Sequence, residues 1–157
     1  MNVLTRALML AVATGALLSL NVHANLGSDN EESTEASFQA GKEAIKAEDW
    51  NKAVDQLEKA VSAEPKNADA RNFLGYAYRK LGYLEQSLMH YKEALALNPK
   101  HKQAHEYLGE AYLMMNKVAD AERHLAELNR LCSPIPCEEQ KMLKTAIDDF
   151  KKGVKRN

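Results

Sequence analysis

The chain has 157 residues, which is enough for one domain. Its 21 basic residues nearly balance its 22 acidic ones, so no overall charge points to nucleic acid or a membrane surface as a partner. Ala, Leu, Glu and Lys dominate most of the chain, and this composition favours helix.

The N-terminal segment has the layout of a secretory signal peptide. Arg6 supplies a basic start, Ala7 to Leu20 form a short apolar run, and Val22-His23-Ala24 places small residues where a signal peptidase cuts. The run is shorter than the roughly 20 residues that a membrane-spanning helix needs. We therefore predict a signal peptide over residues 1–24 and a periplasmic or secreted mature protein with no membrane span. An uncleaved N-terminal anchor is the alternative.

Residues 25–35 read NLGSDNEESTE and are polar and acidic. Leu26 is their one apolar residue, so this segment has too little apolar surface to bury a face. We predict a disordered leader here, and a folded domain over residues 36–152.

From about residue 34 onward the chain repeats itself in register. Gly41, Gly75 and Gly109 stand at intervals of 34 residues, and Pro65 and Pro99 keep the same interval. The copies cover about residues 34–67, 68–101 and 102–135, and in each the apolar spacing predicts two helices. The predicted helices are Ala36–Ala47, Trp50–Ala63, Asp69–Leu81, Leu84–Leu97, His101–Met115 and Val118–Leu131.

The residues at fixed places in each copy resemble the tetratricopeptide repeat family, over about Thr34 to Ile135. The first-helix pattern Leu-Gly-x2-Tyr appears as Leu74-Gly75-x2-Tyr78 and as Leu108-Gly109-x2-Tyr112, and in a weaker form as Ala40-Gly41-x2-Ala44. The second-helix pattern Ala-x3-Phe reads Ala53-x3-Leu57, Ser87-x3-Tyr91 and Ala121-x3-Leu125. The leading Trp of the family pattern is absent from every copy.

This resemblance implies an all-α, right-handed superhelical array of three helix–turn–helix tetratricopeptide repeats. A C-terminal capping helix is expected over residues 137–152, running from about Glu138, and a basic tail over residues 153–157. The apolar face of the capping helix would close the open end of the array. That face consists of Leu143, Ala146, Ile147 and Phe150.

Cys132 and Cys137 are the only cysteines. In an exported protein two nearby cysteines usually pair, so we predict a structural disulfide that clamps the third copy to the capping helix. Free or exchanging thiols and a metal site are the alternatives. A redox enzyme of the Cys-x-x-Cys type does not fit the Cys-x4-Cys spacing.

Four histidines are candidates for chemistry. His101 and His105 are four residues apart and could face one metal ion, but no third ligand is evident nearby. His90 and His124 are one repeat apart and are expected on a solvated outer face. No nucleophile motif, phosphate loop or paired-acid signature stands out. We predict no catalytic residue, no metal and no cofactor.

In arrays of this family the first helices of successive repeats line a concave groove that binds peptides or helices of protein partners. Tyr76 is expected to be an exposed anchor there, and Arg79 a cation for a partner's carboxylate. A subtype that grips chaperone C-termini is not supported, because Phe38, Phe73, Gln103 and Tyr107 stand where it needs Lys, Asn or Arg. The groove residues implied by the resemblance are Phe38, Lys42, Ile45, Asn72, Tyr76, Arg79, Glu106, Glu110 and Leu113.

The sequence therefore predicts an exported, non-catalytic adaptor or scaffold that binds a protein or peptide partner through this groove, and binds no nucleic acid. The alternative is a structural module that self-associates through its N-terminal repeat. A redox-active or enzymatic protein is the third possibility. The oligomeric state stays open.

Overall fold

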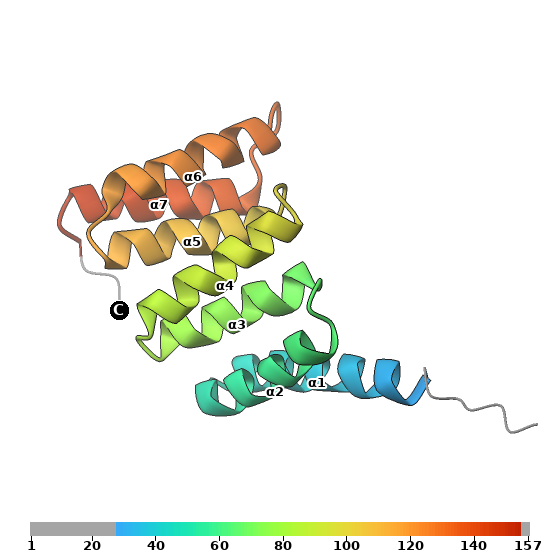
Figure 1. The fold of residues 1–157 in the computed structure, drawn as a ribbon. Coiled ribbons are helices and arrows are strands. Elements are labelled where there is room, and N and C mark those ends of the chain that lie inside the picture. The colour runs from blue at the N-terminus through green and yellow to red at the C-terminus, as the bar shows by residue number, and fades with distance from the viewer. Residues whose placement is uncertain (1–27, 155–157) are drawn as a thin grey trace, which may run out of the picture.

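A computed structural model describes residues 28–154, so the predicted signal peptide and most of the basic tail lie outside the described residues. Seven helices and no strand are present in that range, which confirms the all-α prediction. They stack in chain order as hairpin pairs from one end of the molecule to the other (Figure 1). The helices are α1 (Ser28–Lys46), α2 (Trp50–Ala63), α3 (Ala68–Lys80), α4 (Leu84–Leu97), α5 (Lys102–Met114), α6 (Val118–Leu131) and α7 (Glu138–Lys151).

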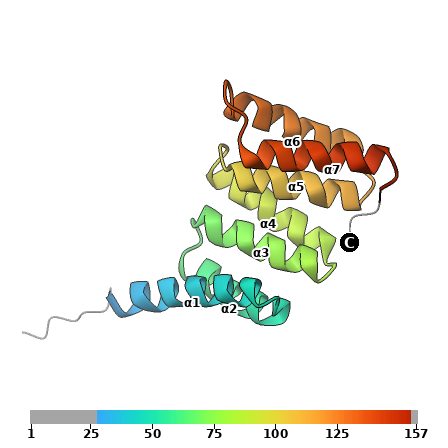
Figure 2. The same ribbon diagram turned by 180° about the vertical axis from the view of Figure 1, so that it is seen from behind.

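The helices form two layers. The first helix of each pair contacts the first helix of the next, so α1, α3, α5 and α7 succeed one another in one layer (Figure 2). The second helices α2, α4 and α6 make up the other layer, and each packs on the next first helix in the chain. The layer of first helices thus continues past the third repeat into α7.

The predicted helix boundaries agree with the structure except at the N-terminus. The bounds of α2, α4 and α6 are those predicted, and α3, α5 and α7 differ by one residue at one or both ends. The prediction of a disordered leader was wrong over residues 28–35, because α1 begins at Ser28. Two local contacts lie at the C-terminal part of this extension: Gln39 donates to Glu35 over 2.5 Å, and the Ser37 hydroxyl donates to the Ser33 carbonyl over 2.9 Å.

The repeat glycines allow the helices to approach closely. A Cβ atom at Gly41 would lie 2.6 Å from Leu57 Cγ, and one at Gly75 would lie 2.8 Å from the Tyr91 ring. At Gly109 the nearest atoms, at 2.6 Å, belong to Leu143 of α7 instead. The capping helix therefore inserts into the third repeat, and Leu143 is fully buried there.

The cysteines lie where α6 meets α7. The structure joins Cys132 and Cys137 in a disulfide, with their Cα atoms 5.4 Å apart. Cys132 is buried in the cluster that α7 shares with α5 and α6. The bond therefore ties the end of the third repeat to the start of the cap.

The prediction that His90 and His124 are solvated was wrong. His90 is 9% exposed and stacks on Tyr78, with ring centroids 5.5 Å apart. His124 stacks on Tyr112 in the same way, at 5.7 Å. Both tyrosines belong to the family motif, so each of these two repeats packs a histidine against its motif tyrosine.

Candidate functional site

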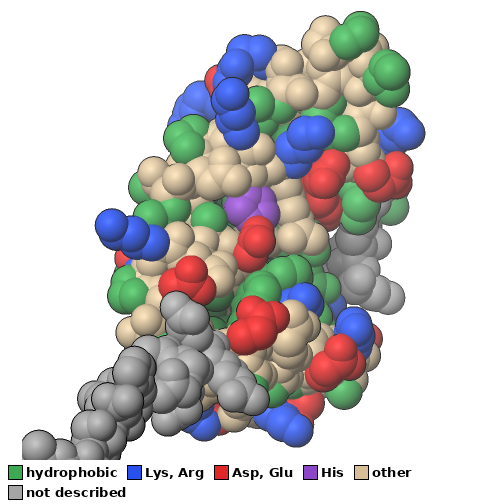
Figure 3. Space-filling model, turned by 90° about the vertical axis from the view of Figure 1, so that its right-hand side faces the viewer, with side chains coloured by type: hydrophobic (Ala, Val, Ile, Leu, Met, Phe, Trp, Pro, Cys, Tyr) green, Lys and Arg blue, Asp and Glu red, His purple; other side chains and the backbone are tan. Residues whose placement is uncertain are grey.

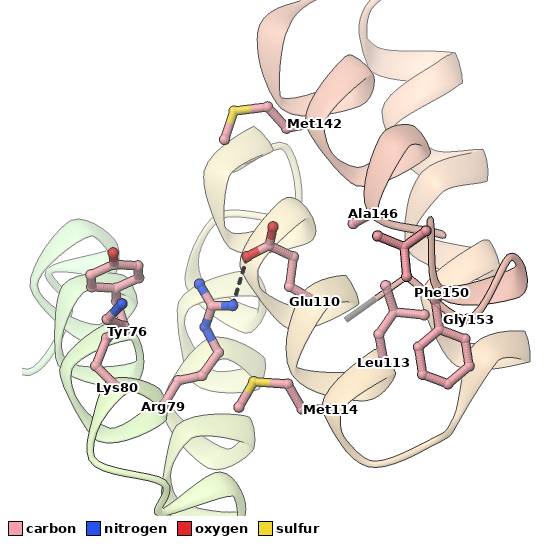
Figure 4. A pocket seen from close by; sticks show the side chains of 11 residues that line it. Tyr76, Arg79, Lys80, Glu110, Leu113, Met114, Met142, Ala146, Phe150 and Gly153 are labelled. Carbon is pink, nitrogen blue, oxygen red and sulfur yellow. Dashed lines mark hydrogen bonds and ion pairs between the residues drawn. The ribbon is translucent and has the colours of Figure 1, made fainter. Parts of the chain in front are cut away.

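A groove of about 1140 Å³ runs along the layer of first helices, between α3, α5 and α7. Figure 4 shows its walls: Tyr76 and Lys80 project from α3 on one side, and Met142 and Phe150 from α7 on the other. The lining residues are Tyr76, Arg79, Lys80, Glu110, Leu113, Met114, Met142, Ala146, Phe150, Gly153 and Val154.

Apolar side chains open to solvent distinguish this groove. Met114 is 55% exposed, Met142 is 43% exposed and Val154 is 53% exposed, and Phe150 beside them is half-buried. By contrast, acidic, basic and hydrophobic side chains are interspersed over the side of the array that Figure 3 shows. Large apolar side chains gathered in a concavity mark a surface suited to a partner.

Arg79 is fixed within the groove wall. Its Cζ atom lies 5.2 Å from the centroid of the Tyr76 ring and 5.3 Å from that of Tyr107. Its guanidinium donates to Glu110 over 2.6 Å, as the dashed line in Figure 4 marks. The Arg79 side chain is only 11% exposed, so its predicted role as a free cation for a partner's carboxylate was wrong.

Tyr76 belongs to an aromatic row that braces the wall. Its ring centroid lies 4.8 Å from that of Tyr107 and 5.9 Å from that of Trp50. The Lys80 ammonium in turn lies 5.1 Å from the centre of the Trp50 ring. Tyr76 is half-buried, so it forms part of a rigid wall and is less exposed than the sequence suggested.

The predicted groove residues fall into three groups. Tyr76, Arg79, Glu110 and Leu113 line the groove. Asn72 and Glu106 are on the same helices but are buried, at 0% and 3% exposure. Phe38, Lys42 and Ile45 belong to α1 and do not line it: the Phe38 ring packs 5.9 Å from that of Phe73, with the Lys42 ammonium 5.0 Å from its centre.

The sequence interpretation missed the wall that α7 provides. It assigned groove columns to the three repeats alone, whereas Met142 and Phe150 come from the cap and Val154 from the turn after it. A signal was present, since Leu143 stands 34 residues after Gly109 and continues the repeat register. In that register α7 is a further first helix, and its groove side is apolar.

Carboxylates from α5 and α7 lie close together where α7 begins. Burial raises the pKa of Glu106 to about 7, and the nearby carboxylates of Glu110, Glu139 and Glu138 raise it further. Arg79 acts in the opposite direction. Glu138 and Glu139 form the first turn of α7, so the acidic end lies where α7 begins.

The described residues include no group of three or more His, Cys, Asp or Glu that could hold a metal ion. His101 instead caps α5, accepting from the Ala104 amide over 3.3 Å, while its Nε2 lies 2.9 Å from Asp69. His105 Nε2 lies 3.0 Å from the Pro99 carbonyl oxygen. Both histidines therefore have structural roles. Within residues 28–154 no helix has the length and hydropathy needed to cross a membrane.

Comparison with known proteins places the chain in a family. Two family descriptions match, "TPR repeat" over residues 75–116 and "Tetratricopeptide repeat" over residues 38–88. No curated protein sequence matches the chain.

Three similar solved structures illustrate the fold. The TPR domain of Arabidopsis OM64 is 23% identical, with a TM-score of 0.70 and coverage of 80% of this chain and 99% of that one. The TPR2B domain of yeast Sti1, in complex with pHsp70, is 16% identical, with a TM-score of 0.72 over 78% and 98%. The first TPR of Spaghetti (RPAP3), bound to an HSP90 peptide, is 19% identical, with a TM-score of 0.69 over 78% and 94%. At these identities the likeness establishes the fold, and together with the repeat matches it shows that the chain belongs to the tetratricopeptide repeat family.

Proposed function

We propose that this protein is an exported, non-catalytic adaptor that binds a peptide segment of a protein partner in the groove between α3, α5 and α7. The observation that carries the proposal is that solvent-open apolar side chains line that groove along its length, namely Met114, Met142 and Val154. The peptides seated on the TPR domains of Sti1 and Spaghetti support it, since the same fold binds a peptide there.

The groove suits this role because its wall is braced before any ligand arrives. Arg79 is held by Glu110 and by two tyrosine rings, so the wall has little side-chain freedom to lose on binding. Methionine adapts its shape to different apolar partners. Each apolar Å² covered contributes on the order of 25 cal/mol, so covering several such side chains is a substantial driving force.

Photo-crosslinking tests the proposal. A benzophenone amino acid placed at Met142 reports on the groove, and the same group at Met89 of α4 is a matched control. Met89 is similarly exposed, at 48% against 43% for Met142, but it does not line the groove. We expect the cells that make the protein to yield crosslinks from position 142 to a small set of proteins, and few from position 89.

Equal crosslinking from the two positions would contradict a groove-specific partner. Crosslinks from position 142 that consist only of a second copy of this chain would contradict an adaptor for another protein and would show that the groove serves self-association. Export is tested separately: mass spectrometry of the protein from its native host should find a mature chain that begins at Asn25. A full-length, membrane-bound chain would favour the uncleaved anchor.

A further inference from the structure

We propose that the groove selects a peptide in which a Lys or Arg side chain stands beside apolar residues. The cation would enter the acidic end, where Glu110 lines the groove and Glu106, Glu138 and Glu139 lie next to it on α5 and α7, and the apolar residues would cover Met142 and Met114. This inference rests on the proposed function and adds the chemistry of the partner.

The acidic end is built from two neighbouring helices. Glu106 and Glu110 are one turn apart on α5, and Glu138 and Glu139 occupy the first turn of α7, which packs against α5. The other three carboxylates are close enough to Glu106 to disfavour its negatively charged form. Arg79 pairs with Glu110, and Lys141 lies 3.7 Å from Glu138 on the exposed surface.

Glu106 is the independent sign that a donor is missing. Its side chain is buried, with 3% exposure, and no described residue donates a hydrogen bond to its Oε1. A buried carboxylate oxygen without a donor costs free energy, because water that solvated it has been removed and nothing replaces it. A cation lodged beside Glu106 would bring the donor that this oxygen lacks and a positive charge against the neighbouring carboxylates.

The groove also has a direction. Glu110 and Met142 lie toward the acidic end, and Met114, Phe150 and Val154 lie toward the C-terminal ends of α5 and α7. A ligand that matches both ends carries its positive charge on one side and its apolar residues on the other. An acidic peptide would meet like charges at the acidic end, which disfavours it strongly.

Selection from a phage library of short random peptides tests the inference. The baits are the parent protein, the double variant Glu106→Gln/Glu139→Gln, the groove variant Met142→Asp, and the control Glu85→Gln, which alters an exposed carboxylate on α4. We expect the parent and the Glu85→Gln control to enrich peptides with Lys or Arg next to apolar residues. The double variant should lose the preference for Lys and Arg while it still enriches apolar peptides.

The most enriched peptide is then synthesised with Lys or Arg and with norleucine at the basic position. The basic form should bind the parent about tenfold more tightly than the norleucine form. This difference in affinity should shrink in high salt and disappear in the double variant. Equal affinity of the two forms would overturn the inference and leave the proposed function standing. Binders that ignore the Met142→Asp change, or the absence of binders, would overturn both.

The unfolding midpoint distinguishes a Glu106 that serves ligand binding from a Glu106 that only holds the fold together. If Glu106 is kept for binding, Glu106→Gln should leave the unfolding midpoint unchanged or raise it at about pH 8, because an unsatisfied buried charge is removed. A marked loss of stability would show that Glu106 holds the fold together, and would overturn its assignment to the ligand site.

Discussion

Arg79 is the residue on which the groove wall depends. Its side chain is 11% exposed and that of its partner Glu110 is 19% exposed. If one of the two were removed, the charge of the other would stay largely out of contact with water. We expect Arg79→Ala to lower the free energy of unfolding by about 2 kcal/mol or more, because the nearly buried carboxylate of Glu110 loses the guanidinium that neutralises it. Denaturant unfolding measures this effect.

The double variant Arg79→Leu/Glu110→Leu is the control for that experiment. It removes both charges and keeps apolar volume, so most of the lost stability should return. A single Arg79→Ala variant as stable as the parent would show that the pair is an ordinary surface ion pair, worth about 0–1 kcal/mol.

His124 makes the third repeat sensitive to acid. Burial lowers the pKa of His124 to about 4, and the neighbouring His105, Arg123 and Lys92 lower it further, against the opposing effect of Glu127. The unfolded chain therefore binds a proton on His124 more readily than the folded chain does. The stability that neutral His124 contributes to the folded state is fully present above pH 6.5, the ordinary pKa of histidine. It is lost as the pH falls from there toward about 4, the pKa of His124 in the folded state.

Comparing the parent with His124→Phe isolates this contribution, since Phe can keep the stack on Tyr112 but cannot titrate. The unfolding midpoint of the parent should fall more steeply than that of the variant between about pH 6.5 and pH 4. Glu106 contributes with the opposite slope, because its raised pKa means that the folded state holds its proton more tightly up to about pH 7. Both proteins keep Glu106, so its effect on the two pH curves is the same and cancels in the comparison. Parallel pH curves would contradict the role of His124.

Among the elements, the turns inside the repeats share one backbone requirement. Glu48, Gly82 and Asn116 stand at intervals of 34 residues, and all three have positive φ, at 54°, 83° and 60°. A residue with a Cβ atom is strained in this conformation, by roughly 1 kcal/mol for one such as Glu. The second repeat avoids the strain with glycine and the first does not.

A reciprocal pair of substitutions tests this explanation of the turns. Glu48→Gly should raise the free energy of unfolding by about 0.5–1 kcal/mol, and Gly82→Ala should lower it by about 1 kcal/mol. A Cβ atom at Gly82 would meet nothing within 4 Å, so the second change acts through the backbone alone. Thermal melts of both variants measure these changes in stability. A Glu48→Gly variant less stable than the parent would contradict the explanation that positive φ strains Glu48.

The sequence predicted the repeat helices closely because each has a periodic apolar face and the register fixes its ends. The N-terminal extension of α1 was missed because residues 28–35 have no periodic apolar pattern, although the helix begins at Ser28. The burial of Asn72 and Glu106 was also missed. Their columns indicate the groove side of a helix, but only packing decides which of those side chains are covered.

For the whole molecule, the disulfide and the cap together decide how firmly the array is closed. The disulfide closes a small loop, so the chain-entropy model gives it about 2 kcal/mol. The inserted Leu143 and the rest of the buried cluster remain without it. We expect Cys132→Ser/Cys137→Ser to lower the unfolding midpoint by several degrees and to leave the helical circular dichroism spectrum unchanged.

Thiol labelling of the unreduced, denatured parent is the companion measurement. It should find no free thiol in protein taken from an oxidising compartment. Two labelled cysteines per chain would contradict the native disulfide, whereas loss of helix in the double variant would show that the array depends on the bond more than its loop size implies.

The central claim is that a partner peptide occupies the groove between α3, α5 and α7. The methionine methyl groups report on it directly, because Met114 and Met142 line the groove and Met89 lies outside it at a similar exposure. In a methyl NMR spectrum of the mature protein labelled at methionine, titrated with the most enriched library peptide, we predict that the Met114 and Met142 signals shift together while Met89 stays in place. Shifts confined to Met89, with Met114 and Met142 unmoved, would contradict the claim.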